Sequence, residues 1–243
     1  MIRLLFFLFL PLLLWGEPVQ IPTVDLTINA PDQPVQLVKS LNILLMLTLL
    51  ILAPSLVLVM TSFTRLLVVF SFLRQALGTQ QMPPSQLLVS LALVLTFFIM
   101  EPAARQAYTD GIQPYMDEKI GYEEAFEKSA RPFQDFMIRN TREKDLALFL
   151  RIRQMENLQS PEDIPLTVLL PAFMISELKT AFEIGFLLFL PFLVIDMVVS
   201  SVLMAMGMMM LPPVMISMPF KIILFILVDG WNLIVQNLVA SFK

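Results

Sequence analysis

The residues of this chain that could do chemistry are charged side chains placed inside long apolar segments. Six of them interrupt the apolar C-terminal part: Glu177, Lys179, Glu183, Asp196, Lys221 and Asp229. A lone charge at membrane depth costs a few kcal/mol, so such residues either pair with one another or line a path for ions. Lys179 and Glu183 are four apart and would share a helix face, which predicts a pair within the chain. Buried structural pairs are the simplest interpretation, and a proton relay through carboxylates is the alternative.

The rest of the side-chain inventory excludes most enzyme chemistry. The 243 residues contain no Cys and no His. Disulfide scaffolds, thiolate or imidazole metal sites and imidazole acid–base catalysis are therefore excluded. The 16 basic and 20 acidic residues, with a net charge of −4, leave no basic face for nucleic acid. We expect no enzyme activity, no metal, no cofactor and no nucleic-acid partner; a membrane enzyme is the least supported class.

A cluster of methionines is the second unusual feature. Five of them stand between Leu203 and Leu211: Met204, Met206, Met208, Met209 and Met210. Methionine is unbranched and adaptable, so a cluster fills irregular space and repacks around changing partners. Gly207 and the pair Pro212-Pro213 favour a bent loop here. The cluster is either ordinary core filler or a deformable apolar collar around a passage; a copper site is disfavoured without His and Cys.

The elements that must position these residues are membrane helices. The chain is 57% hydrophobic and 15% charged, with a mean hydropathy of +0.78, which is too apolar for a soluble domain. Between Glu101 and Asp163 lie 13 acids and 9 bases, which is 22 of the 36 charges. We therefore expect an all-α membrane-associated protein in which two broken helical hairpins flank a small helical insert outside the cytoplasm.

The N-terminal residues have the pattern of a leader. Arg3 precedes an uninterrupted apolar run, Leu4–Leu14, which is too short to cross a bilayer core of about 30 Å as a helix. Residues 1–16 are predicted to be a signal peptide, with an N-terminal anchor as the alternative. Residues 17–39 would then form an irregular extracytoplasmic segment.

Residues 40–100 are predicted to form the first apolar helical hairpin. Ser40–Thr64 carries no charge and is long enough to span a membrane, with a break or kink expected near Pro54. Arg65 and Arg74 are the only charges up to Met100, so the turn beside them should face the cytoplasm. Three residues mark that turn: Gly78, Pro83 and Pro84.

Residues 164–243 are predicted to form the second apolar hairpin, with the Met-rich loop and the turn at Pro212 and Pro213. Leu211-Pro212-Pro213 echoes Met82-Pro83-Pro84, and each motif is followed by an apolar run. A conventional count gives four spans. Prolines and charges break these runs, however, so we expect the helices to be covered by other protein rather than by lipid.

Residues 101–163 form the charged insert, which is predicted to be periplasmic. Gly121–Met137 and Asn140–Met155 both have the pattern of amphipathic helices, and the spacing of Asn140 and Glu143 predicts a capping box. The insert is either a solvated helical pair or an assembly surface for identical subunits.

Several long motifs closely resemble the FliP family of flagellar type III secretion export-gate proteins. The similarity runs from about Leu41 to the C-terminal residues and is carried by the segments Thr61–Arg65, Leu73–Pro84, Pro171–Phe173, Ser176–Gly185, Pro191–Asp196, Met206–Pro213, Pro219–Lys221 and Leu227–Trp231. Virulence-injectisome relatives share this architecture, but the segment from Ala76 and the closing Val228-Asp-Gly-Trp resemble the flagellar members.

The resemblance implies a function in protein export. Such a subunit forms a ring-like homo-oligomer with FliQ and FliR, associated with FlhB and FlhA, in the flagellar basal body at the bacterial inner membrane and its periplasmic side. Exported flagellar subunits pass unfolded through its centre. By resemblance, the pore gasket is Met206, Met208, Met209 and Met210. By the same resemblance, Glu177, Lys179 and Glu183 serve subunit assembly, and Lys221 and Asp229 pair between subunits.

One hypothesis from another class stays open. An ion- or proton-coupled membrane transporter would use Glu177, Glu183 and Asp196 as a relay. Such a transporter would work without FliQ and FliR and would bind its substrate near the middle of the membrane.

Overall fold

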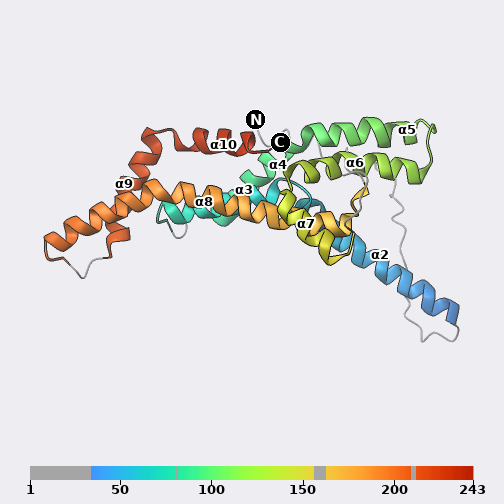
Figure 1. Cartoon of the computed structure of the whole chain (residues 1–243), viewed down its shortest axis with the longest axis horizontal. Coiled ribbons are helices and arrows are strands. Elements are labelled where there is room, and N and C mark those ends of the chain that lie inside the picture. Colours follow the sequence, from blue (N-terminus) through green and yellow to red (C-terminus); the bar gives the residue numbers. More distant parts are fainter. Residues whose placement is uncertain (1–33, 80–81, 156–162, 209–211, 243) are drawn as a thin grey trace, which may run out of the picture. The chain divides into compact units, whose positions relative to one another are not determined.

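The computed structural model describes residues 34–79, 82–155, 163–208 and 212–242, and throughout these ranges the regular structure is helical, without a strand (Figure 1). The all-α prediction is confirmed for this part of the chain. The predicted signal peptide and most of the segment that follows it lie outside the described residues. The chain divides after Leu50 into two compact units, and the second comprises residues 51–243.

Helix α2, Pro34–Val59, is apolar and largely exposed from Ser40 onward. Its portion Ser40–Val59 is long and apolar enough to cross a membrane, and none of it is buried. Pro54 lies inside this helix, which continues to Val59, so of the break or kink predicted near Pro54 the break is absent. A proline removes a single backbone hydrogen bond, and the bonds on either side of it can continue the helix. The helix ends instead just before Met60–Ser62.

Helix α3, Phe63–Ala76, is the most buried element of the second unit. Its apolar residues recur at helical spacing and lie in the first core cluster: Leu66, Val69, Phe70, Leu73 and Ala76. It packs against α8, Leu166–Ala205, and against α4, Ser85–Ala107 (Figure 1). Because α3 is covered by two long helices, polar groups on it must find partners inside the protein.

Helix α4 passes through the composition change at Glu101. It continues through Pro102 to Ala107, then through a π-helical turn, Tyr108–Ile112, into the short α5, Gln113–Met116. The stretch Ser85–Met116 qualifies as one candidate span, although the charges had placed its end at Met100. Gly111 is required in the π-turn because a Cβ there would lie 2.8 Å from the carbonyl oxygen of Ala125.

The insert also supplies α6, Tyr122–Asn140, and α7, Glu143–Ile152, close to the two predicted helices. The predicted capping box is wrong. Asn140 ends α6 and donates to the Phe136 carbonyl at 2.9 Å. The start of α7 is held from outside the insert, because Ser176 of α8 accepts from the Arg142 backbone N–H at 3.0 Å and donates to Asp145 at 2.7 Å.

The C-terminal part consists of α8, α9, Pro213–Leu227, and α10, Gly230–Ala240. Helix α8 runs for 40 residues through Pro171 and Pro191. The expectation that prolines would break this apolar run is therefore wrong. Helices α9 and α10 meet at an angle of 66°. Within the described residues, three helices are long and apolar enough to cross a membrane, or up to four if the bent pair forms one span.

Candidate functional site

A buried ion pair joins α3 to α8. Arg65 Nε donates to Glu177 Oε2 at 2.9 Å, and Nη2 donates to Oε1, which makes a two-pronged contact. The side chains are 3% and 0% exposed. The remaining nitrogen of Arg65, Nη1, donates to the Ser241 carbonyl at 2.8 Å and to its hydroxyl at 2.9 Å. Glu177, expected to serve assembly, thus has its partner within its own chain.

The sequence predicted Arg65 only as a sign of topology, whereas the structure makes it the partner of Glu177. A signal for its role was present, because a carboxylate inside an apolar helix needs a base from another apolar segment. The apolar segments up to Ser241 contain only Arg65, Arg74, Lys179 and Lys221 as bases. The choice among these four bases depends on the packing of α3 on α8, and the spacing of residues along the sequence does not show which helices pack together.

A second ion pair joins α8 to α9. Lys221 Nζ donates to Asp196 Oδ2 at 2.7 Å and to the Ala76 carbonyl at 3.0 Å. Ser217 donates to the other Asp196 oxygen. The Ala76 carbonyl belongs to the last turn of α3, where carbonyls lack partners within the helix. The structure therefore pairs Lys221 within the chain, where the resemblance implied pairing between subunits.

The third pair lies nearer the surface. Arg142 Nη2 donates to Glu183 Oε2 at 2.9 Å and to Thr180 Oγ1 at 3.3 Å. The predicted Lys179–Glu183 pair is therefore wrong, because α7 brings a guanidinium closer to the carboxylate. Lys179 is exposed beside apolar side chains of α8, including Phe182 and Phe186, and forms no ion pair with any residue in the described ranges.

Asp229 occupies the bend between α9 and α10. It adopts a left-handed conformation, with φ +51° and ψ +51°, directly before the first residue of α10. Gly230 follows with no room for a side chain, since a Cβ there would lie 2.3 Å from the Phe225 ring. Trp231 meets that ring edge-on, with 5.6 Å between centroids. Asp229 is exposed and makes no ion pair in the part of the chain that the structure describes.

The methionine loop follows α8 directly. Met208 N donates to the Leu203 carbonyl and Gly207 N donates to the Met204 carbonyl, both at 3.0 Å, while Gly207 has φ +75°. These two bonds form a Schellman ending, which needs a residue in the left-handed conformation. Met206 is 65% exposed and Met208 is half-buried. Met209 and Met210 lie outside the described residues.

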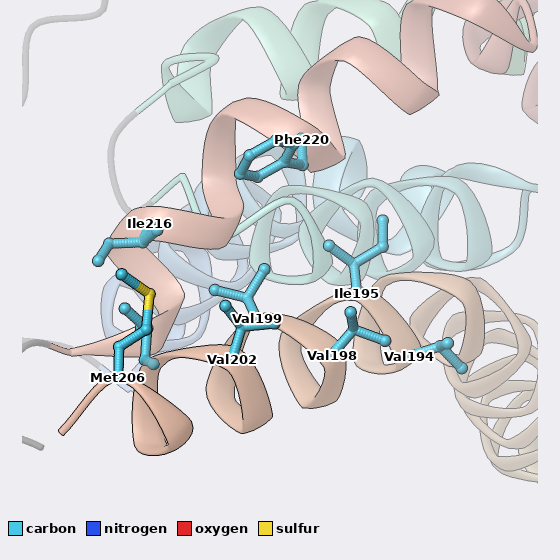
Figure 2. Close-up of a pocket in the computed structure, with 9 residues that line it drawn as sticks. Val194, Ile195, Val198, Val199, Val202, Met206, Ile216 and Phe220 are labelled. Carbon is cyan, nitrogen blue, oxygen red and sulfur yellow. The ribbon is translucent and has the colours of Figure 1, made fainter. Parts of the chain in front are cut away.

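An apolar groove lies between the end of α8 and the start of α9 (Figure 2). Its volume is about 540 Å³, and every side chain that lines it is apolar. In Figure 2, Met206 lies at the loop end of the groove opposite Ile216, and Phe220 lies further along α9. The lining residues are Val194, Ile195, Val198, Val199, Val202, Leu203, Met206, Ile216 and Phe220.

Gly78, after α3, lies against the first turn of α9. Gly78 follows α3 with φ +75°, and a Cβ on it would lie 3.3 Å from Val214 Cγ1 in the first turn of α9. Pro84 precedes α4 after the cis Met82–Pro83 bond, and Pro212 and Pro213 begin α9. The structure thus brings Gly78, one of the predicted turn residues, to the N-terminal end of the second hairpin's returning helix.

Comparison with known proteins identifies this arrangement. Residues 46–238 match the FliP family. The chain belongs to the FliP family. The flagellar biosynthetic protein FliP of Bacillus subtilis strain 168 is 54% identical over 217 residues, which cover 89% of this chain and 98% of the relative. FliP of Aquifex aeolicus strain VF5 is 48% identical over 226 residues, covering 92% and 93%. FliP of Pectobacterium carotovorum is 53% identical over 203 residues, covering 84% and 79%.

Membership of the FliP family confirms the resemblance and indicates a role in building the flagellum. The geometry agrees less well with the transporter hypothesis. Each carboxylate of the supposed relay has a basic partner in the same chain: Glu177 has Arg65, Glu183 has Arg142 and Asp196 has Lys221. A carboxylate that is held in an ion pair has a structural role. Because each of the three carboxylates pairs with a different base, they do not form one connected relay.

Proposed function

We propose that this FliP-family chain is a structural, pore-forming subunit of the flagellar type III protein export gate. It passes unfolded flagellar subunits across the inner membrane during flagellum assembly and does no bond chemistry. It acts as a homo-oligomer with FliQ and FliR, associated with FlhB and FlhA, in the basal body at the inner membrane and its periplasmic side. Family membership and the apolar helices support this proposal.

One observation carries the pore-forming part of the proposal. Met206 is largely exposed at the loop end of the groove between α8 and α9, and this groove has no polar lining. Glu177, Glu183 and Asp196 of α8 and Lys221 of α9 are paired within the chain, and Lys179 is the one charge of these two helices without an ion pair among the described residues. The surface that this end of the hairpin leaves for partners is apolar. Exposed apolar residues continue over this end of the hairpin: Val198, Val202, Met204, Val214 and Met215. A soluble monomer would not leave such a surface uncovered.

The methionines form the seal in this proposal. Met206, Met208, Met209 and Met210 of neighbouring copies meet around the passage and exclude water and ions when it is empty. Methionine side chains are unbranched, so they can repack around the varied side chains of a passing polypeptide. Exposed Lys179 and Asp229 remain available for contacts between subunits. Glu177, Glu183 and Lys221 form ion pairs within each copy, and they serve assembly by holding its helices in the arrangement that the oligomer requires.

The division of the chain follows from the same proposal. Residues 1–16 are a signal peptide and residues 17–39 an extracytoplasmic segment. Residues 40–100 and 164–243 form the two hairpins, with their turns at Gly78–Pro84 and Pro212–Pro213, and residues 101–163 form the periplasmic insert. In the structure, α4 continues across the first of these insert boundaries, so the insert is an extension of the hairpin helices rather than a separate body.

The test replaces Met208, Met209 and Met210 with Ala in a flagellated strain. Secretion of hook subunits and leakage of ions across the membrane are measured, together with recovery of the intact oligomer. Met116→Ala is the control, because Met116 is an exposed methionine of α5, outside both the predicted gasket and the apolar surface at this end of the hairpin.

Leakage with an intact oligomer, and none in the control, is the expected result. Tight membranes with normal secretion in the triple variant would return the methionines to the role of core filler. Normal export in the absence of FliQ and FliR would instead favour the transporter hypothesis.

A further inference from the structure

Arg65 contacts both ends of the segment that forms the second hairpin. Its Nε and Nη2 hold Glu177 on α8, where the segment begins. Its Nη1 holds the carbonyl and the hydroxyl of Ser241, directly after α10, where the segment ends. A single guanidinium on α3 therefore joins two points that lie 64 residues apart in the sequence, and the methionine loop lies between them.

Phe242 closes the same contact from another side. The Arg65 guanidinium carbon lies 3.9 Å from the centroid of the Phe242 ring, within cation–π distance. The same ring stacks with Phe136 of α6, at 6.0 Å between centroids and 23° between planes. Phe242 packs against both core clusters of the second unit. Ser241 and Phe242 thus pack against α3 and the two core clusters.

A second attachment lies further along α3. The Ala76 carbonyl holds Lys221 of α9, which in turn holds Asp196 of α8. Arg65 and Ala76 are 11 residues apart on one helix, which places them about 16 Å apart along its axis. The second hairpin is therefore fixed to α3 at two levels. The part beyond Asp196 and Ser217, which holds the methionine loop and most of the groove lining, has no comparable polar attachment among the described residues.

We propose that Ser241 and Phe242 are positioning residues that close a clamp around Arg65. The clamp fixes α10, and through it α9, against α3 and α8, and so sets where the groove and the methionine loop are presented. Its effect on export rests on the function proposed above. The clamp itself is a property of the single chain, so it can be tested separately from export.

The test uses a chain that has no Cys of its own. Leu238→Cys places one thiol on α10 at a side chain that is 1% exposed. The rate at which N-ethylmaleimide modifies this thiol is measured in the purified full chain in detergent. The rate is compared in four backgrounds: the parent, Ser241→Ala with Phe242→Ala, Phe242→Tyr and Gln236→Ala. Gln236 is an exposed residue of α10 and serves as the matched control. Hook-subunit secretion is measured for the same three substitution backgrounds without the reporter.

The double substitution should raise the modification rate at least about tenfold, because α10 opens locally when its end is released. Phe242→Tyr keeps the aromatic ring and Gln236→Ala leaves the clamp intact, so both should retain the parent rate. Secretion should fall only in the double variant. An unchanged modification rate in the double variant would overturn the clamp. A faster rate with normal secretion would overturn its positioning role while leaving the export-gate proposal untouched.

Discussion

The pair Lys221–Asp196 provides the sharpest test of how the apolar helices tolerate charge. The Lys221 side chain is 3% exposed and the Asp196 side chain 30%. In Asp196→Ala the ammonium keeps one described acceptor, the Ala76 carbonyl. Removing one partner of a buried pair leaves an uncompensated charge, which costs about 3–5 kcal/mol.

Lys221→Met and the double variant complete a double-mutant cycle, and both should lose less stability than Asp196→Ala. In Lys221→Met the carboxylate is partly exposed and retains the Ser217 hydroxyl, so we expect a loss of about 1–3 kcal/mol. The double variant buries no charge, and methionine has nearly the length of lysine, so the main loss is the unpaired Ala76 carbonyl at about 1–2 kcal/mol. The single losses should therefore exceed the double loss by at least about 2 kcal/mol.

The free energy of unfolding of the four full-length proteins is measured by titration with sodium dodecyl sulfate in mixed micelles. The control cycle uses Arg142→Ala and Glu183→Ala, because this pair is nearer the surface and should show a coupling of about 0.2–1 kcal/mol. Additive effects at Lys221 and Asp196, within about 0.5 kcal/mol, would refute the argument that the pair is an internal unit of each chain.

Three backbone predictions can be measured by the same titration. Asp229→Gly should stabilise the protein by about 0.5–1 kcal/mol and Asp229→Val should destabilise it by about 1–2 kcal/mol, because the position has φ +51°; a loss of stability in the glycine variant would contradict this. Gly185→Ala should cost about 1–3 kcal/mol, because its Cβ would lie 2.5 Å from the Phe72 ring. The same change should cost less in a Phe72→Ala background, and an equal cost would show that the ring is not the obstacle. Gly111→Ala should destabilise the protein even with Ser129→Ala, since a carbonyl oxygen at 2.8 Å remains in the way; full recovery in that double variant would be the contrary result.

Local chemistry in the sequence was sufficient for the helical class, the charged insert and several helix ends. Gly78 and Gly207 both follow helices with φ +75°, as glycine after an apolar helical run indicates. Proline misled where it was expected to break helices at Pro54, Pro171 and Pro191. A proline removes one hydrogen bond, and its effect on a long apolar helix depends on the bonds around it and on the surrounding packing.

The ion pairs were decided by tertiary structure. Composition determined that charges inside apolar helices need partners, since desolvation penalises a lone charge whatever the fold. Which partner each charge found depends on which helices pack together, as Glu183 shows by pairing with Arg142, directly before α7, in place of Lys179 one turn away. The hydrogen bonds from Arg65 to Ser241 likewise join residues 176 positions apart. No local pattern records a contact of that range, because it exists only once α3, α8 and the end of α10 have packed together.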